Sequence, residues 1–136
     1  MHKKYIKTFK ALTYTWSLSL YIACIIPAEK IPLNKGYDKI EHFAAYFILT
    51  CLIFCGWPRI SSLKILAFVL LFGAFIELTQ FFIPSRTAEL LDILANIFGM
   101  ILGLLIMNLF KKNTQNEDRG CLNYKALLEG RSNKRN

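Results

Sequence analysis

The sequence has little of the chemistry by which enzymes are usually recognised. Its 136 residues include four cysteines and two histidines, and no cysteine has the spacing of a zinc site. Cys24, Cys51 and Cys55 lie within apolar stretches, where cysteine behaves as a small hydrophobic residue, and Cys121 lies in a polar tail. No serine or cysteine carries the local signature of a nucleophile. These absences argue against a disulfide framework, a structural zinc site and thiol catalysis.

Long linkers and internal repeats are also absent from the sequence. This favours one domain over residues 1–112, followed by a basic tail over residues 113–136. The tail is polar, and we expect it to be a mobile cytoplasmic segment with at most a short helix near residues 124–128.

The hydrophobic residues, 54% of the chain, are gathered into four runs, at about residues 9–27, 40–57, 63–83 and 92–110. A bilayer core about 30 Å thick needs about 20 helical residues, and the runs have this length. A soluble protein of this size could not enclose four helices that are apolar on every face. The sequence therefore predicts an all-α fold, an integral membrane bundle of four transmembrane helices. Short turns at Pro58 and Pro84 make helices two and three, and then three and four, neighbours.

The formal net charge of +8 indicates how the protein is oriented in the membrane, and we do not interpret it as a sign of nucleic-acid binding. Basic residues mark cytoplasmic loops, and here they gather at one end of the runs. They lie before the first run, around the turn between the second and third runs, and after the fourth run. These residues are Lys3, Lys4, Lys7 and Lys10, then Arg59 and Lys64, then Lys111 and Lys112. We expect a multi-pass protein of the cytoplasmic membrane with both termini inside. The first run could instead be a cleaved signal, since residues 21–24 faintly resemble a lipoprotein cleavage site.

The other ends of the runs carry polar side chains, although ionisable groups are costly at membrane depth and mark functional sites by default. Their helical spacings of three and four residues place several of them on shared helix faces. The candidate ligand-binding residues are Asp38, Lys39, His42, Tyr46, Glu77, Gln80, Arg86, Asp92 and Asn96. Arg86, in a short loop, is the expected cationic partner, because its planar fork can hold a carboxylate or a phosphate.

Gly99 and Gly103 follow this cluster on the fourth run, with the spacing that lets membrane helices approach closely. One interpretation is a homo-oligomer interface. The preferred one is packing within the chain that brings Asp92 and Asn96 against helix three.

The polar residues together resemble the VanZ-like family of small membrane proteins. The resemblance rests on Asp38-Lys-x-x-His42-Phe-x-x-Tyr46, on Glu77-x-x-Gln80, and on Arg86-x5-Asp92-x3-Asn96-x-x-Gly99. Each piece is weak alone, but their order and spacing from residue 37 to 103 are specific. The resemblance implies a compact helical membrane domain and a link to the cell envelope, since one member is associated with glycopeptide resistance. It implies no settled biochemical activity.

Three functions compete. The first is recognition of an anionic envelope lipid or a lipid-linked cell-wall precursor in a polar pocket of the outer leaflet, with Arg86 and Lys39 neutralising phosphate. The second is an enzyme acting on such a lipid, in which His42, Glu77 and Asp92 would be catalytic. Those three residues could act as general acid and base or hold a divalent metal, although no cofactor is expected. The third is a purely structural polar network. We expect membrane lipids as partners and no nucleic acid.

Overall fold

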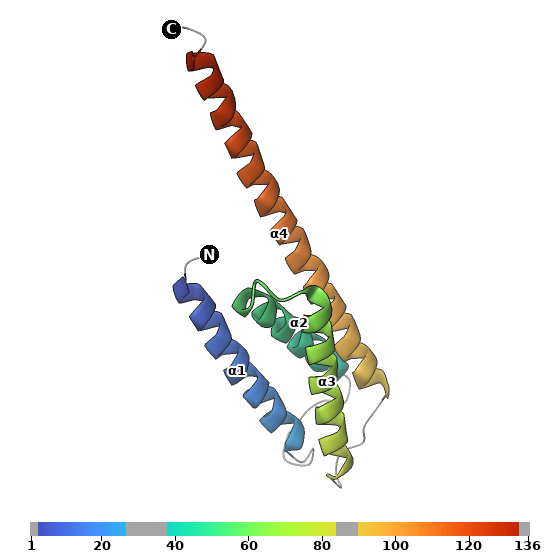
Figure 1. The fold of residues 1–136 in the computed structure, drawn as a ribbon. Coiled ribbons are helices and arrows are strands. Elements are labelled where there is room, and N and C mark those ends of the chain that lie inside the picture. The colour runs from blue at the N-terminus through green and yellow to red at the C-terminus, as the bar shows by residue number, and fades with distance from the viewer. Residues whose placement is uncertain (1–2, 27–37, 84–89, 134–136) are drawn as a thin grey trace. The chain divides into compact units, whose positions relative to one another are not determined.

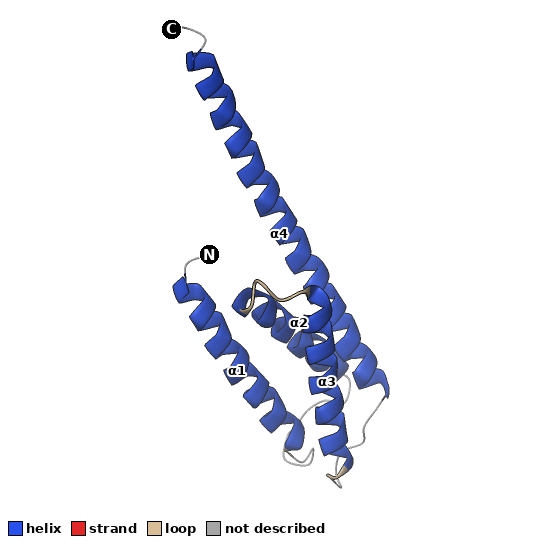
Figure 2. Ribbon diagram, in the orientation of Figure 1, coloured by secondary structure: helices blue, strands red, loops and turns tan. Residues whose placement is uncertain are grey.

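The computed structural model describes residues 3–26, 38–83 and 90–133, and all its regular secondary structure there is helical (Figure 2). The helices are α1 (Lys3–Ile25), α2 (Asp38–Gly56), α3 (Ser62–Phe81) and α4 (Leu90–Asn133), shown in Figure 1. The all-α fold predicted from the apolar runs is therefore confirmed. The chain divides into two compact units, residues 1–104 and residues 105–136.

Three of these helices are long and apolar enough to cross a membrane, with candidate spans at Lys39–Gly56, Ser62–Phe81 and Leu91–Glu117. Helix α1 is not one of them, because Lys4, Lys7 and Lys10 and several serines and threonines lower its mean hydropathy. Its membrane crossing stays a prediction.

The fourth helix is much longer than the sequence suggested. We expected it to end near residue 110, with at most a short helix near residues 124–128, but α4 continues without a break to Asn133. That boundary was wrong because it followed hydropathy alone. No proline lies between Leu90 and Asn133, and the lysine, glutamine, glutamate and arginine residues beyond 110 are good helix formers. The mobility and cytoplasmic location of the tail stay predictions.

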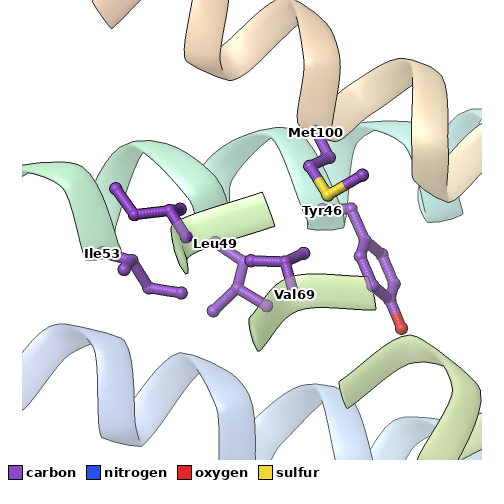
Figure 3. Packing of buried hydrophobic residues seen from close by; sticks show 6 residues of the cluster. Tyr46, Leu49, Ile53, Val69 and Met100 are labelled. Carbon is purple, nitrogen blue, oxygen red and sulfur yellow. The ribbon is translucent and has the colours of Figure 1, made fainter. Parts of the chain in front are cut away.

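The core of the first unit lies between the helices and is apolar. Leu49, Ile53, Ile65, Val69 and Met100 are nearly inaccessible, and Figure 3 shows α2, α3 and α4 all contributing to this cluster. Many large apolar side chains on the outer faces are exposed instead, such as Leu71, Phe81 and Phe98. That distribution suits helices whose outer surface meets lipid.

Helices α2 and α3 are antiparallel neighbours, as the proline turn predicted. In the turn, the amide of Ile60 donates to the carbonyl of Trp57 at 3.0 Å. Ser61 then precedes α3 in an extended conformation. Pro58 supports this stop because it disfavours helical geometry in the residue before it.

The packing of α4 onto α2 depends on two glycines. A Cβ added at Gly99 would collide with the carbonyl of Phe43, and one at Gly103 would lie 3.1 Å from the carbonyl of Phe47. Both glycines thus pack within the chain, and their contacts are with α2. Asn96, which this packing was expected to bring against helix three, lines one cavity with residues of α3. Glycine at these positions removes the side chains that would hold the two backbones apart.

Candidate functional site

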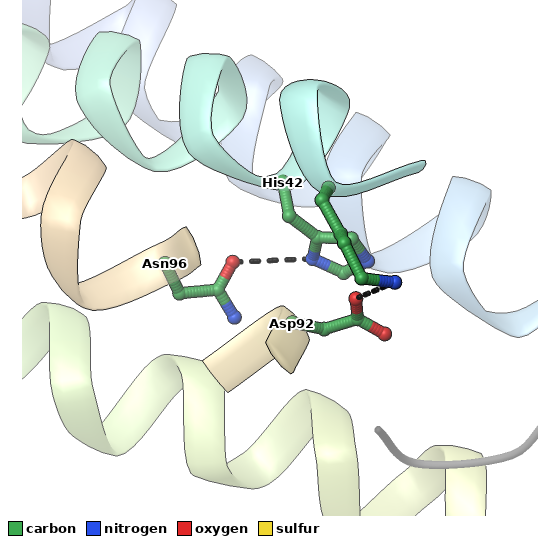
Figure 4. A network of polar contacts seen from close by, with 4 residues as sticks. His42, Asp92 and Asn96 are labelled. Carbon is green, nitrogen blue, oxygen red and sulfur yellow. Dashed lines mark hydrogen bonds and ion pairs between the residues drawn. The ribbon is translucent and has the colours of Figure 1, made fainter. Parts of the chain in front are cut away.

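The first unit has a polar end, where the last turns of α1 and α3 lie near the first turns of α2 and α4. The side chain of Gln80 on α3 donates to the carbonyl of Cys24 on α1, with Nε2 and O 3.3 Å apart. Two further contacts, described next, join α2 to α4 (Figure 4). The polar end therefore gathers residues that lie far apart in the sequence.

His42 and Asn96 form a hydrogen bond between α2 and α4. His42 Nδ1 lies 3.1 Å from Asn96 Oδ1, and Asn96 is 6% exposed. With the amide oriented in this way, Nδ1 carries the proton and Nε2 of a neutral imidazole would be an acceptor. The enzyme hypothesis placed His42 beside Asp38 or Glu77, whereas its Nδ1 is oriented here by an amide.

Lys39 and Asp92 form an ion pair beside this hydrogen bond. Lys39 Nζ is 3.8 Å from Asp92 Oδ1, and the side chains are 39% and 8% exposed. Asp92 is thus a buried carboxylate whose cationic neighbour reaches the surface. The sequence had pointed to Arg86 as the cationic partner of the carboxylates and to Lys39 as a second cation for phosphate, and the structure pairs Lys39 with Asp92.

Tyr46, Glu77 and Asn96 line a cavity of about 600 Å³ between α2, α3 and α4. Each of the three side chains is almost fully buried. The remaining lining is apolar and comes chiefly from α3 and α4, including Leu71, Leu78, Phe81, Ile93 and Ile97. A mainly apolar cavity with a few convergent polar groups is the usual form of a ligand site.

The Tyr46 hydroxyl, which faces this cavity, is buried and has no hydrogen-bond partner among the residues that the structure describes. The tyrosine ring lies against Gly73 of α3, where a Cβ would come within 3.2 Å of the ring and of the hydroxyl oxygen. A buried hydroxyl of this kind usually finds a partner, so a ligand atom in the cavity would satisfy it.

Of the nine predicted ligand-binding residues, the structure brings seven to the polar end. These are Lys39, His42, Tyr46, Glu77, Gln80, Asp92 and Asn96. Arg86 and the side chain of Asp38 lie outside the residues described, so their roles stay predictions.

The metal version of the enzyme hypothesis does not fit the geometry. Among the described side chains, no three or more His, Cys, Asp or Glu residues lie close enough to hold one metal ion. His42, Glu77 and Asp92 are all described, and they do not form the ligand set that their residue types allowed. Carboxylates and an imidazole are residue types that can bind a metal ion, but they form a site only when their side chains lie close together.

Two comparisons place this chain among known proteins. The family model described as VanZ/LLP1 matches residues 2–111, most of the chain. The chain belongs to the VanZ/LLP1 family. It is also 34% identical over 99 residues to the uncharacterized protein C11E3.10 of the fission yeast Schizosaccharomyces pombe. That match covers 70% of this chain and 59% of the yeast protein, so the chain spans about three fifths of its relative's length. No solved structure matches it.

Membership of the VanZ/LLP1 family confirms the resemblance seen in the polar residues. With three helices apolar enough to span a bilayer, it identifies a membrane protein.

Sequence reasoning missed what α1 supplies to this VanZ/LLP1 fold. None of the predicted site residues lies on α1, yet its Trp16 indole donates to the carbonyl of Ala45 on α2 at 3.1 Å. Its Cys24 carbonyl accepts the bond from Gln80. The tryptophan was visible as an indole N–H donor in an apolar run, and such a donor usually finds a partner when buried. The role of the Cys24 carbonyl could not be predicted from the sequence, because every residue has a backbone carbonyl.

Proposed function

We propose that this protein recognises an anionic membrane lipid at its polar end, with a hydrocarbon chain in the cavity and the head group beside Lys39, Asn96 and Tyr46. The observation that carries the proposal is the cavity of about 600 Å³, apolar over most of its lining but edged by three buried polar side chains. Its volume falls in the range of ligand sites, about 300–1,000 Å³.

The length of the cavity suits a lipid chain. Its lining on α3 runs from Val69 to Phe81, and this stretch measures about 18 Å at about 1.5 Å per helical residue. The lining includes Leu70, Ala74 and Leu78, which are exposed side chains of α3. A chain from the surrounding bilayer could therefore enter along α3 without unfolding the bundle.

The polar groups suit a head group with both a phosphate and hydroxyls. Lys39 is 39% exposed, and its ammonium lies 3.8 Å from Asp92, so it can turn toward a phosphate. The amide of Asn96 and the hydroxyl of Tyr46 can donate hydrogen bonds, while Glu77 can accept them from a hydroxyl. Arg86 would supply a second positive charge, as the sequence predicted.

The proposed head group is defined by its charge. An anionic envelope lipid and a lipid-linked cell-wall precursor share the phosphate that Lys39 and Arg86 would neutralise, so the proposal covers both. A link to glycopeptide resistance or envelope homeostasis would then act through the lipid.

The proposal includes an orientation. The basic end, with Lys10 and Lys64, would face the cytoplasm, and the polar end would face the outer leaflet of the cytoplasmic membrane, with both termini inside. A reporter that is active only outside the cytoplasm, fused after Lys112, should be inactive. Activity of that fusion would overturn this topology.

A matched pair of substitutions on α3 tests the lipid site. Ala74 and Ala67 are both exposed on α3 and lie two turns apart, but only Ala74 lines the cavity. Ala74→Trp should fill the cavity and lower the amount of lipid that co-purifies with the detergent-extracted protein, as measured by native mass spectrometry. Ala67→Trp should retain it.

The head group is tested separately by Arg86→Ala, which should remove the rise in melting temperature that anionic lipid gives the wild type. Equal lipid retention by the two tryptophan variants would refute the cavity as the lipid site. An unchanged thermal shift in Arg86→Ala would refute the role of that arginine.

A further inference from the structure

The opposite end of the first unit holds a second cavity, of about 410 Å³, between α1, α2 and α3. Its lining is mainly apolar and aromatic, with Ile53, Trp57, Ile65, Phe68 and Phe72 among its residues. Thr13, which also lines it, is 3% exposed and donates its hydroxyl to the carbonyl of Phe9 at 2.8 Å. The threonine is therefore satisfied within its own helix, and the cavity presents a chiefly hydrocarbon surface.

Positive charge surrounds this cavity. Lys64 is exposed and lines it directly, and the Nζ of Lys10 lies 5.1 Å from the centre of the Trp57 ring, over its face. Arg59 is exposed in the neighbouring turn. A cation over a tryptophan face is held by the ring, which keeps the Lys10 ammonium beside the cavity.

No carboxylate balances this charge from the segments that form the cavity. The sequence has no Asp or Glu from residue 1 to 28 or from residue 42 to 76, and these stretches contain every residue of the cavity. The first turns of α1 and α3 contain no acidic residue. An anion bound here would thus meet lysine without competition from a carboxylate in these stretches.

The Trp57 ring is fixed on two sides. Tyr14 packs against it edge to face, with ring centres 5.9 Å apart and planes at 87°. Lys10 lies over it. Aromatic rings of this kind commonly occupy the boundary between hydrocarbon and head groups, where one side is apolar and the other is wet.

From these contacts we infer that the basic end is a second lipid site, which binds an anionic phospholipid with its phosphate between Lys64 and Lys10 and one acyl chain along Phe68 and Phe72. The ligand is a phospholipid because the cavity joins an apolar lining to unbalanced positive charge at a membrane boundary. This site differs from the polar end, where carboxylates are present, and it does not depend on the function proposed there.

The site is tested with the full-length protein in detergent, to which phosphatidylglycerol or phosphatidylcholine is added, and bound lipid is counted by native mass spectrometry. Phosphatidylglycerol should bind more tightly than phosphatidylcholine. Lys64→Gln should weaken its binding about tenfold, as expected for loss of one charge-assisted contact. Lys7→Gln, which removes one charge from an exposed position of α1 outside the cavity, should change it less than about twofold.

The hydrocarbon part of the site has its own matched pair. Ser17 lines the cavity, whereas Ser19 is exposed on α1 away from it. Ser17→Phe should weaken phosphatidylglycerol binding, and Ser19→Phe should not. In the Ala74→Trp background, in which the polar-end cavity is filled, Ser17→Phe should still weaken the phosphatidylglycerol binding that remains, and Ser19→Phe should not.

Three results would overturn the inference. If Lys64→Gln and Lys7→Gln weakened phosphatidylglycerol binding equally, the lipid would be attracted by the net charge of the protein and not held at a specific site. Equal binding of the two phospholipids would remove the role of the lysines. Added mass equal to a second copy of the chain, in place of lipid, would make this cavity a dimer interface. The lysine variants alter exposed side chains and should fold, so they decide the matter even if Ser17→Phe does not.

Discussion

The two ends of the first unit are held together by different kinds of contact. At the polar end, directional bonds join helices: His42 to Asn96, Lys39 to Asp92, and Gln80 to the carbonyl of Cys24. At the basic end, the contacts between helix side chains and Trp57 include a ring pair with Tyr14 and a lysine over the aromatic face. Hydrogen bonds have strict distances and angles, whereas ring contacts tolerate small shifts. The polar end should therefore set the register of the helices, while the basic end adapts around whatever it binds.

The difference also extends to the backbone. Gly99, one turn beyond Asn96, meets the Phe43 carbonyl so closely that no Cβ fits between them. Gly56, at the basic end, has more room, with the nearest atom 3.3 Å from where its Cβ would be. Close backbone approach and directional bonds thus occur together at the end with the proposed head-group site. Pre-formed geometry of this kind lowers the cost of binding a ligand.

The largest expected effect comes from these two glycines. Gly99→Ala should lower the free energy of unfolding by about 3 kcal/mol, because α2 and α4 must move apart to accept the methyl group. Gly56→Ala should change it by less than about 1 kcal/mol, since its nearest neighbour, the backbone nitrogen of Lys10, is 3.3 Å from the Cβ position and α1 has to move only slightly. Unfolding by sodium dodecyl sulfate titration in mixed micelles measures both. If the two variants were equally stable, the contrast between the ends would be lost.

A smaller effect is expected from the buried hydrogen bond at the polar end. Asn96→Leu keeps the side-chain size but removes the partner of His42, and should cost about 1–2 kcal/mol of unfolding free energy. A double-mutant cycle with His42→Ala should give a coupling of about 1 kcal/mol between the two residues. Zero coupling would show that the 3.1 Å contact contributes nothing.

The same variant separates a structural network from a binding site. If Asn96→Leu remains folded in the mixed micelles but no longer retains lipid, the polar end acts in recognition. If Asn96→Leu, and equally Glu77→Leu, simply unfold the protein, the polar residues serve to join the helices, as the structural hypothesis requires.

The smallest effect should come from the ion pair. Lys39 is 39% exposed, so Lys39→Gln should lower the unfolding free energy by no more than about 0.5 kcal/mol. Its effect on anionic lipid should be larger, with a weaker dependence of lipid affinity on salt concentration than in the wild type. An unaltered salt dependence would exclude this ammonium from the head-group contact.

Much of the polar end was visible in the sequence because helical periodicity is local. The spacings of Asp38, His42 and Tyr46, and of Asp92 and Asn96, place side chains on common faces without knowledge of the fold. The partners were not visible. In the enzyme hypothesis His42 was expected beside a carboxylate, but its Nδ1 meets Asn96. The sequence also did not show that Gly99 contacts α2. Which face turns toward which neighbour depends on helix rotation, which spacing within one helix does not specify.

The sequence by itself determined the class of this protein: its four largely apolar helices, its charged and polar ends, and its family. These follow from run length, charge position and motif order, which are properties of the chain read in one dimension. Only the tertiary structure decided that Tyr46, Glu77 and Asn96 share one cavity, and that a second cavity lies beside Lys64. A cavity is the space that several helices leave between them, and it exists only once their packing is known.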